Sequence, residues 1–155
     1  MKLIALYPPD GWMMPQSRPR MGKHGVYSNA SATLTRWRRW LAENITQHVP
    51  DRFEAGVPVS LYIRFQFVRP ASHYNSKGVL RAGALTFPPN GDIDNLYKAV
   101  ADELEKAGVV HNDSQIVHTN AAKEYVTDDG TLRVKPCLVI GISPWEAVAS
   151  ELRKP

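Results

Sequence analysis

The sequence contains little of what a secreted, disulfide-bonded or membrane-spanning protein needs. Cys137 is the only cysteine among 155 residues, so neither an internal disulfide nor a cysteine-based zinc site can form. No apolar run approaches the roughly 20 residues that span a bilayer. The first apolar run, residues 3–7, ends at Pro8-Pro9 and is too short for a secretory signal. We therefore expect a reducing, cytoplasmic setting and no membrane.

Acidic residues are absent from two stretches in which basic residues are frequent. The net charge of the chain is +4, but the first 50 residues carry +5 and the last 55 carry −3. The basic residues of the two acid-free stretches, 11–42 and 69–91, are Arg18, Arg20, Lys23, Arg36, Arg38 and Arg39, then Arg69, Lys77 and Arg81. Such stretches are typical of a surface that binds a polyanion such as DNA. From composition alone, solvated surface arginines are an equally good interpretation.

The pattern of apolar residues predicts one α+β domain over residues 1–155. Alternation and runs predict strands over 3–7, 57–68, 115–126 and 132–142, and stripes at spacings of three and four predict helices over 32–49 and 93–107. Residues 11–31 and 69–91 show no periodicity and are expected to be loops, and a short last helix is expected over 145–152. The order β-α-β-α-β-β favours a mixed sheet covered by two main helices.

Individual residues refine this expectation. Leu34, Trp37, Leu41 and Ile45 form the apolar stripe of the first helix, and Ile93, Leu96, Val100, Leu104 and Ala107 form that of the second. Arg36, Arg38 and Arg39 fall off the first stripe and should face solvent or a ligand. Asp129-Gly130 predicts a hairpin turn between the last two strands. Tyr27, Trp37, Trp40 and Tyr74 could stack on bases, although core packing is the better interpretation for Trp37.

Acidic residues gather where the second helix begins. Asp92 and Asp94 stand at its start, Lys98 lies one turn later, and Asp102 and Asp113 follow. One carboxylate at this position can be an ordinary helix cap, and Asp94 with Lys98 can be an ordinary helix ion pair. These two interpretations leave the second carboxylate and Asp113 unexplained.

Asp113 is the residue that turns this arrangement into a candidate metal site. If the strand beginning at Gln115 lies beside the strand that precedes the second helix, Asp113 can return near Asp92 and Asp94. Three carboxylates in one place repel each other unless they share a cation, and oxygen ligands suit Mg²⁺ or Mn²⁺. A calcium loop is excluded, because Leu96 and Tyr97 occupy positions that need an oxygen ligand and a glycine.

The combination of these acids with Lys98 and basic flanks favours metal-dependent phosphodiester hydrolysis. A divalent cation polarises the phosphoryl oxygen and supplies hydroxide, and a lysine stabilises the charge of the transition state. The sequence has no phosphate-binding loop, no Gly-x-Ser-x-Gly elbow and no pair of histidines at ligand spacing on a helix.

The run from Gly91 to Lys123 resembles the RusA-type Holliday junction resolvases. The resemblance rests on Asp-Ile-Asp-Asn-Leu-Tyr-Lys-Ala from Asp92, on Asp102, on Asn-Asp-Ser-Gln-Ile from Asn112, and on Lys123. It implies that Asp92, Asp94 and Asp113 bind Mg²⁺, with Mn²⁺ as a substitute, and that Lys98 assists catalysis. It also implies supporting roles for Asn95, Asp102 and Lys123. Members are small endonucleases, often carried by prophages, that cut four-way DNA junctions as homodimers.

The chain departs from the family pattern in two places. Asn112 stands where many members have an acid, and segments 11–27 and 69–91 are longer than in compact members. The leading hypothesis is a Mg²⁺-dependent endonuclease that resolves junctions by two symmetric nicks, which implies a two-fold dimer with one site per subunit. The alternative is a DNA-binding protein without catalysis, or a nuclease without junction specificity.

Overall fold

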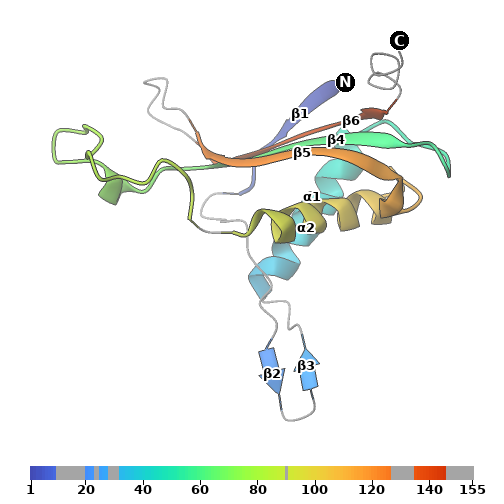
Figure 1. The fold of residues 1–155 in the computed structure, drawn as a ribbon, viewed down its shortest axis with the longest axis horizontal. Helices are drawn as coiled ribbons and strands as arrows, with labels where there is room; N and C mark the ends of the chain where they lie inside the picture. Colours follow the sequence, from blue (N-terminus) through green and yellow to red (C-terminus); the bar gives the residue numbers. More distant parts are fainter. Residues whose placement is uncertain (10–19, 23–24, 28–31, 90, 127–134, 146–155) are drawn as a thin grey trace, which may run out of the picture.

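A four-stranded mixed sheet forms the centre of the structure, and two helices cover one of its faces (Figure 1). The computed structural model describes residues 1–9, 20–22, 25–27, 32–89, 91–126 and 135–145. The strands, in the order β1-β6-β4-β5, are Lys2–Leu6, Cys137–Pro144, Val59–Phe67 and Ile116–Tyr125. Helices α1 and α2 span Ala32–His48 and Ile93–Lys106. The predicted α+β class and the predicted order of these six elements are confirmed.

The pairing of the strands corrects one prediction. β4 is parallel to β5 and antiparallel to β6, and β6 also pairs with β1. Because β4 lies between β5 and β6, the hairpin predicted from Asp129-Gly130 is wrong. An Asp-Gly pair favours a local turn, but it carries no information about a third strand that binds between its two neighbours. Residues 127–134 themselves lie outside the described residues.

A second, two-stranded sheet occurs where a loop was predicted. β2 (Arg20–Gly22) pairs antiparallel with β3 (Gly25–Tyr27), so the prediction of a loop over 11–31 is wrong there. Strands of three residues are too short to show alternation. The rest of that segment, and the predicted last helix beyond Trp145, lie outside the described residues.

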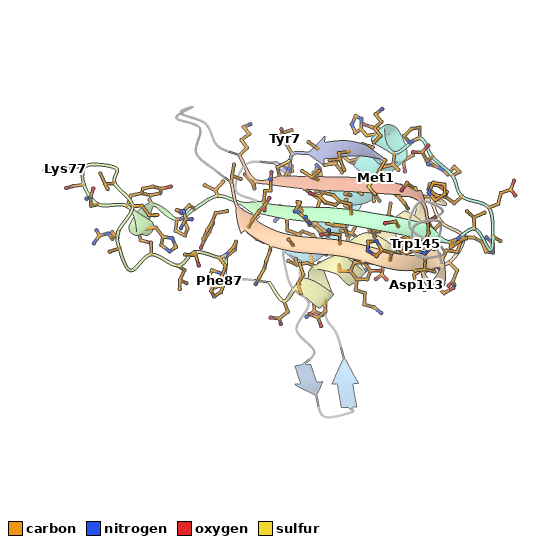
Figure 2. The ribbon with its side chains drawn as sticks, turned by 45° about the horizontal axis from the view of Figure 1, so that its top comes forward. Met1, Tyr7, Lys77, Phe87, Asp113 and Trp145 are labelled. Carbon is orange, nitrogen blue, oxygen red and sulfur yellow. The ribbon has the colours of Figure 1, made fainter. Side chains whose placement is uncertain are left out.

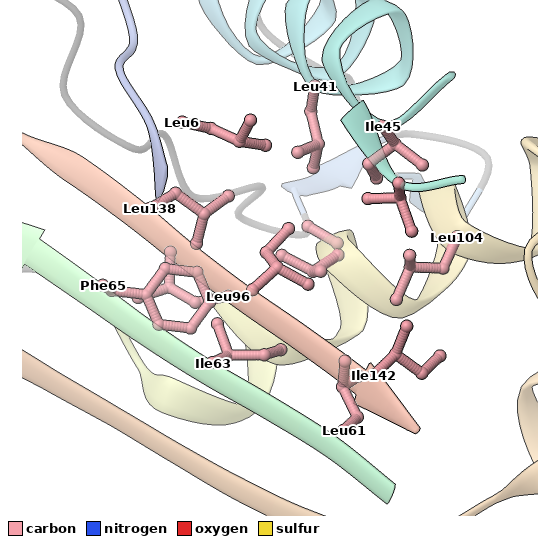
Figure 3. Close-up of a cluster of buried hydrophobic side chains, with 14 of the residues drawn as sticks. Leu6, Leu41, Ile45, Leu61, Ile63, Phe65, Leu96, Leu104, Leu138 and Ile142 are labelled. Atoms are coloured by element: carbon pink, nitrogen blue, oxygen red, sulfur yellow. The ribbon is translucent and has the colours of Figure 1, made fainter. Parts of the chain in front are cut away.

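The core fills the space between the helices and the sheet (Figure 3). The predicted stripe of α1 is buried, including Trp37 at 1% exposure, which confirms core packing for this residue. On α2, Leu96, Val100 and Leu104 are buried, whereas Ile93 is 38% exposed and does not belong to the stripe. Alternate residues of β4 contribute Leu61, Ile63 and Phe65. No helix in the described ranges has the length and apolar character to cross a membrane.

The opposite face of the sheet carries polar cross-strand contacts. Ser60 Oγ lies 2.9 Å from His118 Nδ1, and the His118 ring stacks on Trp145. Arg64 Nη1 donates to Asn120 Oδ1 of β5 at 2.9 Å, and its guanidinium also lies over the Tyr62 ring of its own strand. Cys137, the first residue of β6, is a free, buried thiol, and burial raises its pKa, although hydrogen bonds from Tyr7 and the Leu6 backbone oppose the shift.

Residues 68–87, which we call the arm, extend beyond the end of the sheet between β4 and α2 (Figures 1 and 2). No element was predicted here, but the arm contains a 3-10 turn, η1 (Ala71–His73), and a bridge between Tyr74 and Leu80. Its place in the chain puts the arm directly before the residues that begin α2.

Candidate active site

The carboxylates of Asp92 and Asp94 stand at the amino-terminal end of α2. Asp92 is the N-cap residue, with φ −71° and ψ 133°, and Asp94 lies in the first turn. Both residues are exposed, and the Asp92 side chain makes no capping hydrogen bond. An ordinary cap therefore does not account for Asp92. The helix dipole favours negative charge here, while the carboxylate oxygens stay available to a ligand.

Two features define the turn that presents these aspartates: the conformation of Gly91 and a hydrogen bond from Lys123. Gly91 has φ +87°, a conformation that strains any residue with a side chain, and a Cβ there would lie 2.9 Å from Leu96 Cδ1. From β5, Lys123 Nζ donates a 2.6 Å hydrogen bond to the carbonyl oxygen of Gly91. Lys123 is thus brought to the turn beside Asp92, although it lies 31 positions after that residue in the sequence.

Lys98 and Asn95 occupy exposed positions on the first two turns of α2. Asp94 and Lys98 are both described, and no ion pair joins them, so the ordinary helix pair is not formed. The ammonium of Lys98 is close in sequence to two exposed carboxylates on the same helix end. Within the described ranges, the Lys98 ammonium has no ion-pair partner.

Asp113 lies at the opposite end of α2 (Figure 2). It begins a second 3-10 turn, η2 (Asp113–Gln115), and its backbone N–H donates to Glu105 Oε2 at 3.2 Å in the last turn of α2. A helix of 14 residues is about 21 Å long. The expectation that Asp113 returns to Asp92 and Asp94 within one chain is therefore wrong.

The cause is the parallel pairing of β4 and β5. A helix that joins two parallel strands runs back along the sheet, so its first residues lie beyond the carboxyl end of one strand and its last residues near the amino end of the next. Asp92 and Asp94 occupy the first position and Asp113 the second. Among the described residues, no group of three His, Cys, Asp or Glu side chains could hold a metal.

Two exposed carboxylates still form a donor set that fits Mg²⁺. This ion keeps several of its water ligands and commonly binds only one or two protein carboxylates. In the described part of the chain, the side chains of Asp92 and Asp94 have no ion-pair partner. A divalent cation at this helix end would satisfy both.

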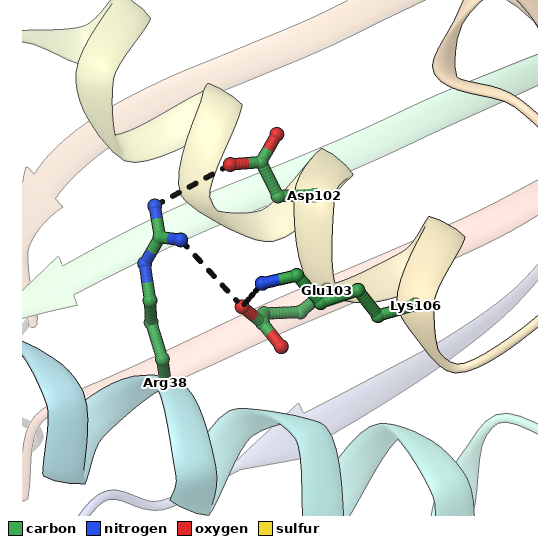
Figure 4. Close-up of polar contacts among 4 residues, drawn as sticks. All are labelled: Arg38, Asp102, Glu103 and Lys106. Atoms are coloured by element: carbon green, nitrogen blue, oxygen red, sulfur yellow. Dashed lines mark hydrogen bonds and ion pairs between the residues drawn. The ribbon is translucent and has the colours of Figure 1, made fainter.

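Asp102, predicted as a supporting residue, takes part in an ion-pair network between the two helices (Figure 4). Arg38 of α1 reaches Asp102 at 3.4 Å and Glu103 at 3.9 Å, and Lys106 contacts Glu103 at 2.8 Å. The Glu103 side chain is only 5% exposed. The prediction that Arg38 projects toward solvent or a ligand is wrong, because its guanidinium faces α2 and compensates a buried carboxylate.

The turn around Asp113 contains a buried polar residue whose structural role was not predicted from the sequence. Gln115 is buried, and its Oε1 accepts hydrogen bonds from the backbone N–H groups of His111 and Asn112. Its Nε2 donates to the carbonyl oxygens of Glu54 and Val57. Asn112 and Gln115 form a capping box, and their three-residue spacing is a signal that the sequence contains.

The other predicted DNA-binding residues fall into three groups. Arg36 and Arg39 are exposed on α1, and Lys77 and Arg81 are exposed in the arm. Arg69 is held at the base of the arm, where its Nη1 donates to the Leu85 carbonyl oxygen at 2.7 Å. Arg18 and Lys23 lie outside the described residues, as does the side chain of Arg20. The proposed stackers Trp40 and Tyr74 are half-buried, and the side chain of Tyr27 is not described.

A comparison with known protein families identifies the family of this chain. Residues 10–135 match the family described as endodeoxyribonuclease RusA. The chain belongs to the RusA family. No curated protein sequence matches it. Membership identifies a family of DNA endonucleases, and the matched range spans the arm and the positions of Asp92, Asp94, Lys98 and Asp113.

Proposed function

We propose that this RusA-family protein is a Mg²⁺-dependent endonuclease that resolves four-way DNA junctions by paired symmetric nicks in recombination and repair. Residues 1–155 would act as one endonuclease domain in the cytoplasm, with Mn²⁺ able to replace Mg²⁺. The observation that carries the proposal is the pair of exposed carboxylates, Asp92 and Asp94, on a rigid turn at the start of α2.

Each residue of this helix end would have a distinct role. Asp92 and Asp94 would hold the cation, which supplies charge stabilisation and a hydroxide nucleophile for phosphodiester hydrolysis. Lys98 would stabilise the negative charge that develops on the phosphate. Lys123 holds the Gly91 carbonyl oxygen and would keep both carboxylates in place. Asn95, beside Asp94 on the exposed surface, would orient the phosphate.

A homodimer would explain how Asp113 can contribute to the same site. The β4-α2-β5 connection separates Asp113 from Asp92 and Asp94 within one chain. A two-fold axis that sets two α2 helices antiparallel would bring Asp113 of the partner subunit to Asp92 and Asp94, and would create two equivalent sites. Two sites per dimer are what two symmetric nicks require. Arg36, Arg39 and the basic residues of the arm would contact the DNA backbone.

The test compares Asp94→Asn with Asp51→Asn, a matched change at an exposed aspartate far from α2's first turn. Labelled four-way junctions, duplexes and single strands are incubated with Mg²⁺, with Mn²⁺ or with EDTA. We expect the native chain and Asp51→Asn to nick junctions in either metal. Asp94→Asn should cut at least about a hundredfold more slowly and bind junctions as tightly or more tightly, because a negative charge near the phosphates is lost.

Two results would replace this function with another. Equal cutting of all three substrates would indicate a general nuclease. Binding without any cutting in either metal, with Asp94→Asn equal to the native chain, would indicate a non-catalytic DNA-binding protein.

A further inference from the structure

The arm combines basic side chains with exposed apolar side chains. It contains Arg69, Lys77 and Arg81 and no acidic residue. It also carries five of the ten large apolar side chains that are exposed in the described part of the chain: Val68, Val79, Leu80, Leu85 and Phe87. Phe87 is 55% exposed and Val79 58% exposed. A basic surface alone would serve phosphate binding, so the apolar side chains need a separate explanation.

The arm is held in one shape by its own hydrogen bonds. Arg81 N–H donates to the His73 carbonyl oxygen, and Asn75 N–H donates to that of Val79. The Asn75 side chain accepts from the backbone N–H groups of Lys77 and Val79. The tip of the arm is therefore closed on itself, and its apolar side chains are exposed by a defined backbone.

Arg69 attaches this shape to the body of the protein. Its guanidinium lies 4.2 Å from the centre of the Tyr125 ring, and Tyr125 is a buried residue at the end of β5. Its Nη1 also holds the Leu85 carbonyl oxygen, which closes the base of the arm between residues 69 and 85. The arm and the turn that presents Asp92 are thus anchored on the same strand, since Lys123 is also in β5.

We infer that the arm is the element that distinguishes branched from continuous DNA, with Phe87 and Leu80 contacting unstacked bases at the branch point while Lys77 and Arg81 contact the backbone. The inference rests on the proposed function. Proteins commonly place apolar side chains between bases at kinked or opened steps, and a base stacked on an aromatic ring gains affinity without sequence preference. In a continuous duplex the same contact first requires a base step to be unstacked, whereas a branch point already offers unstacked bases.

The length of chain between the arm and the aspartates limits the distance along the DNA between the positions that they contact. Phe87 precedes Asp92 by five residues, which span at most about 18 Å. At about 3.4 Å per nucleotide along one strand, this corresponds to roughly five nucleotides. If Phe87 lies at the branch point, the bond that is cut should lie on the order of five nucleotides from it.

The charge of the arm favours DNA over a second protein subunit as its occupant. Two exposed basic residues, Lys77 and Arg81, in a segment without an acid complement the phosphate backbone. A second copy of the chain has a net charge of +4, so as a whole it is a weaker electrostatic partner for the arm than the DNA backbone. A protein partner remains a measurable outcome, because loss of apolar side chains from a subunit interface would lower the mass of the assembly.

The experiment measures two affinities for each variant, one for a four-way junction and one for a duplex of the same sequence. Binding is measured in the Asp94→Asn background, so that no strand is cut. Phe87→Ala and Leu80→Ala should weaken junction binding by about fivefold or more and leave duplex binding within about twofold. Lys77→Ala should weaken both equally, because it removes a phosphate contact. Val117→Ala, at an apolar residue 53% exposed on β5, is the matched control and should change neither.

Three results would overturn the inference. The first is an unchanged ratio of junction to duplex affinity in Phe87→Ala. The second is a loss of junction affinity in Val117→Ala as large as that in Phe87→Ala. The third is a fall in molecular mass, measured by light scattering, in Phe87→Ala. Failure of the proposed function gives a different result, since the chain with native Asp94 would then cut no junction while the affinity ratio still depended on Phe87.

Discussion

The polar side chains at the two ends of α2 differ in their hydrogen bonding: those at one end bond inside the protein, and those at the other end are exposed. At the carboxyl-terminal end, Asn112 and Gln115 cap the following turn, and the four hydrogen bonds of the Gln115 amide are all made inside the protein. At the amino-terminal end, Asp92 occupies the cap position without using its carboxylate, and Asp94 is exposed beside it. The first end is held together by its polar side chains, whereas the second presents them outward.

Along one helix, this difference separates polar residues that stabilise the fold from polar residues that are available to a ligand. A polar side chain whose hydrogen bonds are satisfied internally stabilises the fold, and its removal leaves buried partners unsatisfied. A carboxylate held on a rigid backbone without an internal partner adds little to stability and can bind a ligand. The comparison can be tested by changing matched residues at the two ends.

The largest expected effect on stability comes from Gln115→Leu. This change leaves two backbone N–H groups and two carbonyl oxygens without their partner, and we expect it to lower the free energy of unfolding by about 3 kcal/mol. Asp92→Asn, at the other end, should change it by no more than about 0.5 kcal/mol. Urea denaturation measures both. Equal destabilisation by the two variants would show that Asp92 is also a structural residue.

A smaller effect on stability is expected when the glycines that flank α2 are changed to alanine. Gly91 and Gly108 both have positive φ, of 87° and 68°, so alanine at either position costs about 1 kcal/mol in backbone strain. At Gly91 the new Cβ would also lie 2.9 Å from Leu96 Cδ1, whereas nothing lies within 4 Å at Gly108. Gly91→Ala should therefore cost about 2 kcal/mol and reduce cleavage by displacing Asp92. Gly108→Ala should keep full cleavage, and equal activity of the two variants would contradict this assignment.

The smallest effect concerns the middle of α2, where Arg38 reaches Asp102 and Glu103. Arg38→Met should lower the free energy of unfolding by about 1 kcal/mol, since Lys106 still accompanies Glu103. It should not change how steeply DNA binding falls with salt. Arg39→Met, at the exposed neighbour, should reduce that salt dependence by about one ion and leave stability unchanged. If instead Arg38→Met lowered the salt dependence and left stability unchanged, Arg38 would belong to the DNA-binding surface.

Sequence periodicity predicted the elements of this fold well because burial acts locally on each of them. The stripe of α1 and the alternation of β4 are properties of single segments, and both faces proved to be core. The pairing of β6 with β4 instead of β5 depends on residues far apart in the chain, and a turn motif does not contain that information. The arm was missed for a related reason, because its shape comes from side-chain and backbone hydrogen bonds without an apolar repeat.

The candidate site was predicted in part. The local cluster of Asp92, Asp94 and Lys98 follows from helical spacing and is present as one exposed helix end. Lys123 could be placed beside it only through the register of β5 against β4. The expected position of Asp113 was wrong because adjacency of two strands was considered without their direction, and the direction decides at which end of the sheet Asp113 lies.

The position of β6 has a consequence for the time course of folding. It is the last of the described strands along the chain, yet it lies between β1 and β4 and hydrogen-bonds to both. Contacts between residues so distant in sequence form late, and until β6 is in place β1 has no partner in the sheet and one edge of β4 is unpaired. We therefore expect the sheet to stay incomplete during synthesis until residues 137–144 have left the ribosome, because only then can β1 and the open edge of β4 be paired.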